Sequence, residues 1–415
     1  MSKTIPATQY CKSIFDGTHD TPKPARAGFP LVTSKHITND RLDISTAYLI
    51  SSADYATINK RSKISQWDIL FSMIGTVGEV YLEKDEKTNY VIKNIGVFSC
   101  QNEKKARWLY YYLKSPAAKN HVRRYLNGAV QKFLSLGAMR EFPVLPYNEA
   151  VCKGVDLIAA LDAKIELNNR INTELEAMAK TLYDYWFVQF DFPDANGKPY
   201  KTSGGKMVYN PVLKQEIPEG WLAGTLDDLG RIVGGSTPST KNPDNFTSNG
   251  TPWITPNDLS DNQGNKFITK GAQDISDQGI KDASLKKYPA GTVLLSSRAP
   301  IGYMAIARSE LTTNQGFKSF IPTNNFSSAF IYYTVRNSLK TITQYASGST
   351  FKEISGSVLK TVKISLPVSN VVDTFTKLVE SGFEHQYLLE KENKLHAQLR
   401  DWLLPMLMNG QIKVK

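Results

Sequence analysis

Polar and basic side chains gather in short segments between apolar runs, and their types are those that bind nucleic acids. Arg, Lys, Asn and Gln can read base edges through paired hydrogen bonds, whereas Lys, Ser, Thr and backbone N–H groups hold phosphates. Any single one of these residues could equally be a solvated loop residue. Together they predict a DNA-binding surface made of Thr33, Ser34, Lys35, His36, Lys93, Asn94, Asn127, Gln131, Lys132, Ser296, Ser297, Arg298, Asn314, Gln315, Ser347, Gly348, Ser349, Thr350 and Lys352.

Arg298 follows an apolar, strand-like run, and its position is equivalent to Ile74 in the first half of the chain. A planar guanidinium there could grip guanine in the major groove, an interaction worth about 1–3 kcal/mol of discrimination. It could instead hold a phosphate or stabilise the fold. The sequence leaves these three roles open.

The chain lacks the motifs of the enzymes that act on DNA. It has no Asn-Pro-Pro-Tyr or Asp-Pro-Pro-Tyr motif for methyl transfer to a base amine, no glycine-rich cofactor strand and no P-loop. The stretch GGKM at Gly204–Met207 has neither the upstream glycine spacing nor the Ser or Thr of a phosphate loop. The five histidines show no metal-ligand spacing. We therefore expect a protein without catalytic activity that binds no cofactor or metal itself.

Composition favours a basic globular protein of two or three domains. The 415 residues carry a net charge of +11, and 41% of them are hydrophobic. The charge suits a polyanionic partner, although many basic proteins bind no nucleic acid. Three scattered cysteines indicate neither a disulfide framework nor a zinc site. The chain shows no apolar leader and no membrane-spanning run, so we expect a cytoplasmic protein without a membrane partner.

The elements that must position the polar segments occur twice, because the chain contains an internal repeat. Three matches run in the same order at offsets of 222, 224 and 220 residues. The matched pairs are Gly28–Ile37 with Gly250–Leu259, Trp67–Gly78 with Gly291–Gly302, and Tyr125–Pro146 with Tyr345–Pro367. Short β-branched runs bounded by Gly, Pro and Ser predict strands in both copies. Each copy is followed by a long helical pattern.

Two stretches have the heptad spacing of helices that pack along each other. The first, from Val155 to Trp186, is roughly 50 Å long as a helix. Its predicted seam is Ile158, Leu161, Ile165, Asn168, Asn172, Leu175, Ala179, Leu182 and Trp186. The second stretch, from Val372 to Leu404, has a predicted seam of Leu388, Glu392, Leu395, Leu399, Trp402 and Met406. Polar residues in the seams could fix the register and orientation of the two helices. The alternative to a pair of spacer helices is that both stretches are core helices within one domain.

Several segments give the whole chain a family resemblance. These are the connector that begins WFVQFDFPDANGKPY at Trp186, IPEGW at Ile217–Trp221, TPWITPNDL at Thr251–Leu259, and the end LRDWLLPMLMNGQI from Leu399. The chain resembles the DNA-specificity subunit of type I restriction–modification systems. The likeness covers nearly the full length and is looser in the first half. There the first domain begins almost at once, with IFDGTHDTP at Ile14, which leaves open whether its first strand is complete.

The resemblance implies an α+β fold in which two tandem, strand-rich target-recognition domains are joined by two long antiparallel coiled-coil helices. This is a pseudo-two-fold arrangement. Its expected segments are a first recognition domain (1–147), a central spacer helix (148–190), a connector (191–220), a second recognition domain (221–368) and a C-terminal spacer helix (369–415).

The resemblance also implies partners. Each domain would read one part of a split, asymmetric site in double-stranded DNA. The helices would act as a ruler and bind two methyltransferase subunits, and restriction–translocase subunits would join that core. S-adenosylmethionine, ATP and Mg would then act in the partner subunits. Two alternatives remain: a specificity factor of another phage-defence complex, and a duplicated structural adaptor that binds no nucleic acid.

Overall fold

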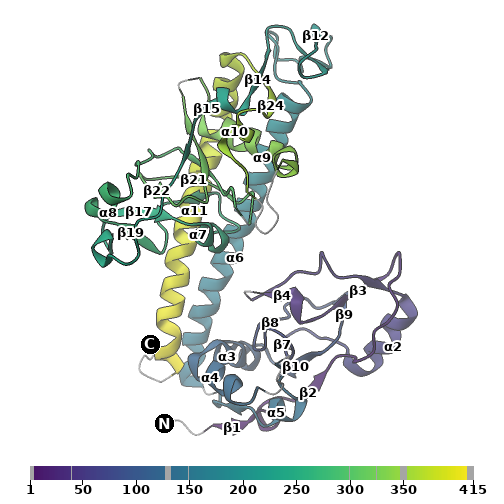
Figure 1. Cartoon of the computed structure of the whole chain (residues 1–415). Coiled ribbons are helices and arrows are strands. Elements are labelled where there is room, and N and C mark those ends of the chain that lie inside the picture. The colour runs from purple at the N-terminus through teal and green to yellow at the C-terminus, as the bar shows by residue number, and fades with distance from the viewer. Residues whose placement is uncertain are drawn as a thin grey trace. The chain divides into compact units, whose positions relative to one another are not determined.

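The computed structural model describes residues 4–38, 40–126, 132–147, 149–298, 300–323, 325–345 and 353–408. The chain forms two compact units (Figure 1). Unit 1 comprises Met1–Ile165 with Leu395–Lys415, and unit 2 comprises Glu166–Lys394. Helices α6 (Glu149–Tyr183) and α11 (Ser369–Met408) both cross this division. Each unit therefore has one strand-rich part and a segment of each long helix, and the five-segment division remains a prediction.

The strand-rich part of unit 1 consists of short strands and helices. They are β1 (Ile5–Pro6), α1 (Ala7–Tyr10), β2 (Ser13–Asp16), β3 (Phe29–Val32), β4 (Ile37–Thr38), β5 (Arg41–Leu42), β6 (Leu49–Ile50), α2 (Ser52–Ser62), β7 (Asp68–Ser72), β8 (Val80–Leu82), β9 (Val91–Ile92), β10 (Ile95–Ser99), α3 (Glu103–Lys114), α4 (Pro116–Arg124), α5 (Leu136–Arg140) and β11 (Pro143–Val144).

The strand-rich part of unit 2 follows a connector hairpin of β12 (Met207–Asn210) and β13 (Gln215–Pro218). Its elements are β14 (Leu222–Thr225), β15 (Gly230–Gly234), β16 (Phe246–Thr247), β17 (Thr251–Ile254), α7 (Pro256–Asp261), β18 (Phe267–Ile268), β19 (Gln273–Ile275), α8 (Asp277–Asp282), β20 (Val293–Leu295), β21 (Met304–Ala307), β22 (Thr312–Thr313), β23 (Lys318–Pro322), α9 (Ser328–Gln344), α10 (Gly356–Leu359) and β24 (Lys363–Leu366).

The internal repeat is visible in the sheets. Unit 1 has a main sheet in the order β2-β10-β7-β8, and unit 2 has one in the order β15-β23-β20-β21-β18. Ile69 pairs with Phe98 in the first sheet, and Val293 pairs with Phe320 at the equivalent place in the second. A smaller sheet in each unit contains one parallel pair, β3 with β9 or β17 with β22. Strand β2 occupies the place of β15, so the first copy does have this strand.

The central strands are buried on both faces, which explains their continuous apolar runs. In unit 2, Val293 and Phe320 pack towards α9, whereas Leu294 faces Ile254 of the smaller sheet. Unit 1 has the same layers, with α3 on one face of its main sheet. Both helices begin at a side-chain cap, Asn102 for α3 and Ser327 for α9. The strand-rich parts thus form layered α+β cores.

Helices α6 and α11 run antiparallel within each unit. In unit 2, the Asn168 side chain donates to Glu392 at 2.7 Å, and Gln386 donates to the backbone carbonyl of Asn172 at 3.0 Å. In unit 1, Arg400 pairs with Asp162 at 2.9 Å. The predicted seam of α6 lies inward, because each of its nine positions is buried or half-buried. Polar contacts between defined partners fix the register of the two helices, since a shift by one residue would break them.

Four of the six predicted seam positions of α11 face outward, whereas Glu392 and Met406 are half-buried. Leu388, Leu395, Leu399 and Trp402 are 52%, 56%, 42% and 62% exposed. The inward positions recur every seven residues and are Val372, Val379, Gln386, Asn393, Arg400 and Leu407, all of them buried or half-buried. Polar residues occupy the middle of this row, whereas the predicted seam follows a more apolar stripe on another face of the helix.

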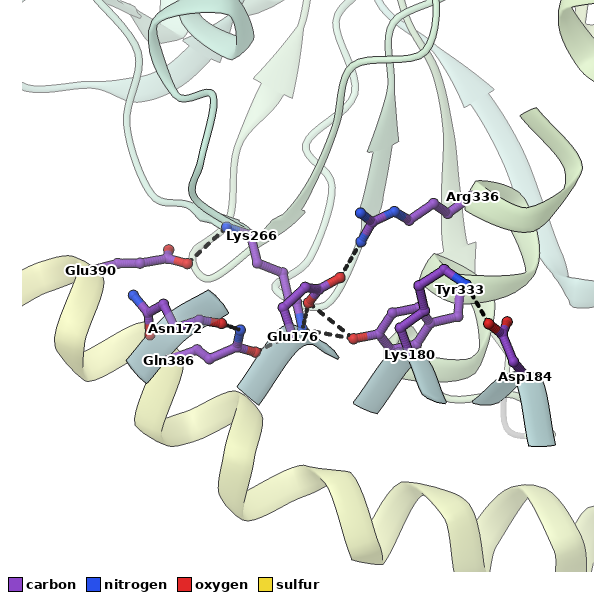
Figure 2. Close-up of polar contacts among 9 residues, drawn as sticks. All are labelled: Asn172, Glu176, Lys180, Asp184, Lys266, Tyr333, Arg336, Gln386 and Glu390. Atoms are coloured by element: carbon purple, nitrogen blue, oxygen red, sulfur yellow. Dashed lines mark hydrogen bonds and ion pairs between the residues drawn. The ribbon is translucent and has the colours of Figure 1, made fainter. Parts of the chain in front are cut away.

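Lys266 links the strand-rich part of unit 2 to its helix segments (Figure 2). Its ammonium group is 2.6 Å from Glu176 Oε2 on α6 and donates to Gln386 Oε1 on α11 at 2.7 Å. It also donates to the hydroxyl of Tyr333 at 3.0 Å. Arg336 forms a second ion pair with Glu176. The buried ammonium therefore has several hydrogen-bond acceptors, as a buried charge requires.

Glu390 provides a second link between α11 and the same strand-rich part. Its carboxylate accepts the backbone N–H groups of Lys266 and Phe267 at 2.7 and 3.1 Å. Burial raises the pKa of Glu390 to about 7, and burial lowers the pKa of Lys266 to about 8. Both shifts have the sign expected when desolvation outweighs the attraction between the charges. The strand-rich part of unit 2 is thus anchored to both helices.

Candidate nucleic-acid interface

A glycine at the end of an outer strand brings two loops together in each unit. A Cβ atom on Gly17 would lie 2.3 Å from the carbonyl oxygen of Ile92, and one on Gly235 would lie 1.9 Å from that of Thr313. The next residue donates its backbone N–H to the same carbonyl, at 3.1 Å for both Thr18 and Ser236. These contacts place the loop after β2 beside Lys93 and Asn94, and the loop after β15 beside Asn314 and Gln315.

In unit 2 this juxtaposition produces a small polar cluster. The Thr237 hydroxyl donates to the Gln315 side chain, and Gln315 is exposed. The Asn314 side chain accepts the backbone N–H of Gly316 at 2.9 Å and thereby orders the turn. The backbone N–H of Ser297 donates to the Gly316 carbonyl at 2.8 Å, which brings the segment of Arg298 to the same place.

Arg298 is partly exposed at the surface and forms an ion pair there. Its Nε atom is 3.1 Å from Glu353 Oε2, and both side chains are partly exposed. A β-bridge also joins these two residues, and Ile74 and Phe133 form the matching bridge in unit 1. The guanidinium is accessible to a ligand, but a ligand anion would compete with Glu353.

Unit 1 forms the corresponding cluster with different side chains. Lys93 donates to the Thr21 hydroxyl. His19 Nδ1 lies 2.9 Å from Asn94 Oδ1. The Ser34 hydroxyl donates to the Asn94 carbonyl at 3.4 Å. The two units thus offer the same loop geometry with different donors and acceptors, as two readers of different sequences would require.

Three of the predicted DNA-binding residues have buried side chains. Ser296 and Ser297 have no exposed surface, and His36 is 3% exposed. The Ser296 hydroxyl donates to the Pro300 carbonyl at 2.7 Å and accepts the N–H of Tyr303 at 2.8 Å. His36 Nδ1 accepts the N–H of Thr33 at 2.8 Å, and burial lowers the pKa of this imidazole. The side chains of Ser296 and His36 hold turns in place, whereas the buried Ser297 hydroxyl has no hydrogen-bond partner among the described residues.

The remaining predicted residues divide into two groups. Lys35 and Lys132 are exposed, and Thr33 is half-buried at the cap of the turn η1 (Ser34–His36). Seven predicted residues lie outside the described part of the chain: Asn127, Gln131, Ser347, Gly348, Ser349, Thr350 and Lys352.

Sequence reasoning missed the loops that follow β2 and β15, with Thr18, His19, Thr21, Ser236 and Thr237. The available signal was Gly-Thr at position 17 and Gly-Ser at position 235, each directly after an apolar strand and separated by 218 residues. Among the described residues, no cluster of His, Cys, Asp and Glu could hold a metal ion. No helix in the described part of the chain is both long and apolar enough to cross a membrane.

The comparisons with known proteins agree with this geometry. The family "Type I restriction modification DNA specificity domain" matches residues 21–177 and 218–386. The chain is 41% identical over 187 residues to the MjaIX specificity subunit of Methanocaldococcus jannaschii, a match that covers 42% of each protein. It is 29% identical over 319 residues to the HindI specificity subunit of Haemophilus influenzae, covering 65% of this chain and 68% of the relative.

A solved structure supports the fold. The S subunit of a type I restriction–modification system from M. genitalium aligns with a TM-score of 0.53 and 12% identity, over 98% of this chain and 96% of the other. The repeated layered domains and their long helices therefore define a tandem specificity-subunit fold. The chain belongs to the type I restriction–modification DNA-specificity family, since the family matches most of its length in two copies.

Proposed function

We propose that this chain reads a bipartite, asymmetric DNA site, with each unit recognising one part. The observation that carries the proposal is the pair of equivalent loop clusters with different side chains. Lys93 and Asn94 stand in unit 1 where Asn314 and Gln315 stand in unit 2. Equal backbones place these groups alike, so different side chains would select different bases.

We further propose that the long helices bind partner subunits, two methyltransferase subunits and the restriction subunits that join them. Large apolar side chains remain exposed on both helices, a feature typical of interaction surfaces. Those of unit 1 are Leu157, Leu395, Leu399 and Trp402, and those of unit 2 are Leu167, Met178, Leu378 and Leu388. Two similar helix surfaces would accept two copies of one partner. S-adenosylmethionine, ATP and Mg would serve catalysis in those partners.

Selection from a random pool of DNA duplexes tests the reading of DNA. The purified chain, alone and with its methyltransferase partner, is mixed with the pool, and the bound duplexes are sequenced. The proposal expects two short conserved blocks separated by a fixed gap. A single contiguous block would contradict the bipartite reading. Absence of any enrichment would instead favour the structural adaptor.

A further inference from the structure

A basic groove in unit 2 lies next to the polar cluster of Thr237 and Gln315. It has a volume of about 390 Å³ and is formed by strand β15 with the following Gly235 and Ser236 on one side and residues 284–286 on the other. Arg231 and Lys286 line it, and both residues are exposed. We call it the Arg231–Lys286 groove. It adjoins the recognition loops because Ser236 continues directly into Thr237.

The charge of this groove is not neutralised by the protein. Its lining contains no carboxylate, and within the described part of the chain neither Arg231 nor Lys286 has an acidic partner. Arg298 differs from Arg231 and Lys286, because it is already paired with a carboxylate, that of Glu353. An anion entering the groove would therefore meet two cations without displacing an existing partner.

Two side chains form hydrogen bonds to the backbone on one side of the groove. The buried Tyr288 donates its hydroxyl to the carbonyl of Gly234, and Trp253 Nε1 donates to the carbonyl of Ser236 at 3.1 Å. Strand β15 is the edge strand of its sheet, so one side of its backbone faces away from the ladder. The backbone on this side of the groove is therefore fixed by hydrogen bonds from two buried aromatic side chains.

We propose that the Arg231–Lys286 groove binds the phosphate backbone of the DNA strand whose bases are read by the loops of unit 2. The inference rests on the proposed function. It assigns a chemical role to two residues that the sequence pattern did not single out. Alignment of Gly17 with Gly235 puts Ser13 at the position of Arg231 in the first copy. Unit 1 therefore has no basic residue at the position of Arg231.

The test compares the full chain with the double variant Arg231→Gln/Lys286→Gln. A duplex selected from the random pool and an unrelated duplex are both titrated by fluorescence anisotropy at several salt concentrations. Lys198→Gln/Lys214→Gln removes the same charge from exposed positions in the connector and serves as the control. Melting curves establish that the variants are folded, and Arg231→Lys should keep the binding of the original chain.

We expect the groove variant to lose about tenfold in affinity for both duplexes and to reduce the slope of log K against log salt concentration by about 1–2, because each phosphate contact contributes about 0.9. A slope equal to that of the control pair would overturn the inference, and so would a loss confined to the selected duplex. Stronger competition by inorganic phosphate than by chloride at equal ionic strength, with an unchanged slope in the variant, would assign the groove to free phosphate instead. Failure of the original chain to prefer the selected duplex would contradict the proposed function, whereas the slope would still test the groove.

Discussion

At the scale of single residues, the structure separates exposed readers from buried supports. Ser296 was predicted to bind DNA because it lies in a loop, yet its hydroxyl closes a turn. Ser72 does the same in the other copy, donating to Thr76 and accepting from Glu79. An identical residue in both copies indicates a shared structural role, whereas readers of different sequences should differ. Exposure and hydrogen-bond partners depend on the folded chain, so composition alone could not separate the two kinds.

Arg298 supplies a prediction at this scale. Arg298→Ala should weaken binding about 5- to 150-fold at a matched site if the guanidinium reads a base, since each 1.4 kcal/mol is roughly a factor of ten. The loss of specificity should be confined to the half-site read by unit 2. Competition binding against single-base variants at two salt concentrations measures it. Equal losses for every base would exclude base reading, and a lowered melting temperature would indicate a structural role.

Glu353→Gln provides the reciprocal experiment. The substitution removes the carboxylate that holds Arg298 at 3.1 Å and leaves a side chain of the same size. Affinity should rise about two- to fivefold, because an exposed ion pair is worth less than about 1 kcal/mol. The Arg298→Ala/Glu353→Gln variant is the control and should lose this gain. A gain that persists without Arg298 would show that Glu353 acts only by repelling phosphates.

At the scale of elements, both long helices could be predicted from the sequence, but the inward face could be predicted only for the first. The seam of α6 contains mostly apolar residues with the heptad spacing. The inward row of α11 contains Gln386, Asn393 and Arg400, so its periodicity is hidden by polar residues that have partners on α6. Trp402 is not the counterpart of Trp186 in the repeat. Matching of Phe187 with Leu404 places Trp186 at Leu403 and the outward Tyr185 at Trp402.

The pH dependence of stability tests the link between α11 and the strand-rich part of unit 2. Because the pKa of Glu390 is raised to about 7, the folded state holds this proton more tightly than the unfolded state. Stability from this group is fully present below its unfolded pKa and is lost as pH rises to about 7. Glu390→Gln resembles the protonated form and should gain about 2 kcal/mol of unfolding free energy relative to the original chain between about pH 4.5 and 7.5.

Denaturant titrations at several pH values measure this difference. Below about pH 7.5 Lys266 stays mostly protonated, because its pKa is lowered to about 8, so its titration contributes little to the comparison. Glu380→Gln, on the exposed surface of the same helix, is the matched control. A free-energy difference that stays constant with pH would contradict the assigned role of Glu390.

The spacer prediction also belongs to the element scale. Inserting one heptad after Lys164 in α6 and one after Lys394 in α11 should lengthen both helices by about 10 Å and keep the seam in phase. If the helices set the distance between half-sites, the gap should grow by about three base pairs while both half-sites stay the same. Methylation patterns of the assembled complex reveal the gap. An unchanged gap would count against the ruler.

At the scale of the whole molecule, the repeat was the most informative property of the sequence. The three offset matches predicted two similar units, and the paired main sheets follow that pattern. Strand order and the parallel pairs of the smaller sheets could not be deduced, because short strands joined by long loops allow many topologies. The Gly17 and Gly235 loops lie beside the polar residues because of these parallel pairs. This part of the site could therefore not be predicted from the sequence either.

The central claim is that the two units read different parts of one DNA site. Methylome sequencing of cells that express this chain with its methyltransferase partner tests it most directly. We expect one asymmetric methylated motif with two defined blocks and a gap of constant length, which changes in one block alone when the loops of unit 2 are altered. A contiguous motif would contradict it, as would changes in both blocks after substitutions restricted to unit 2.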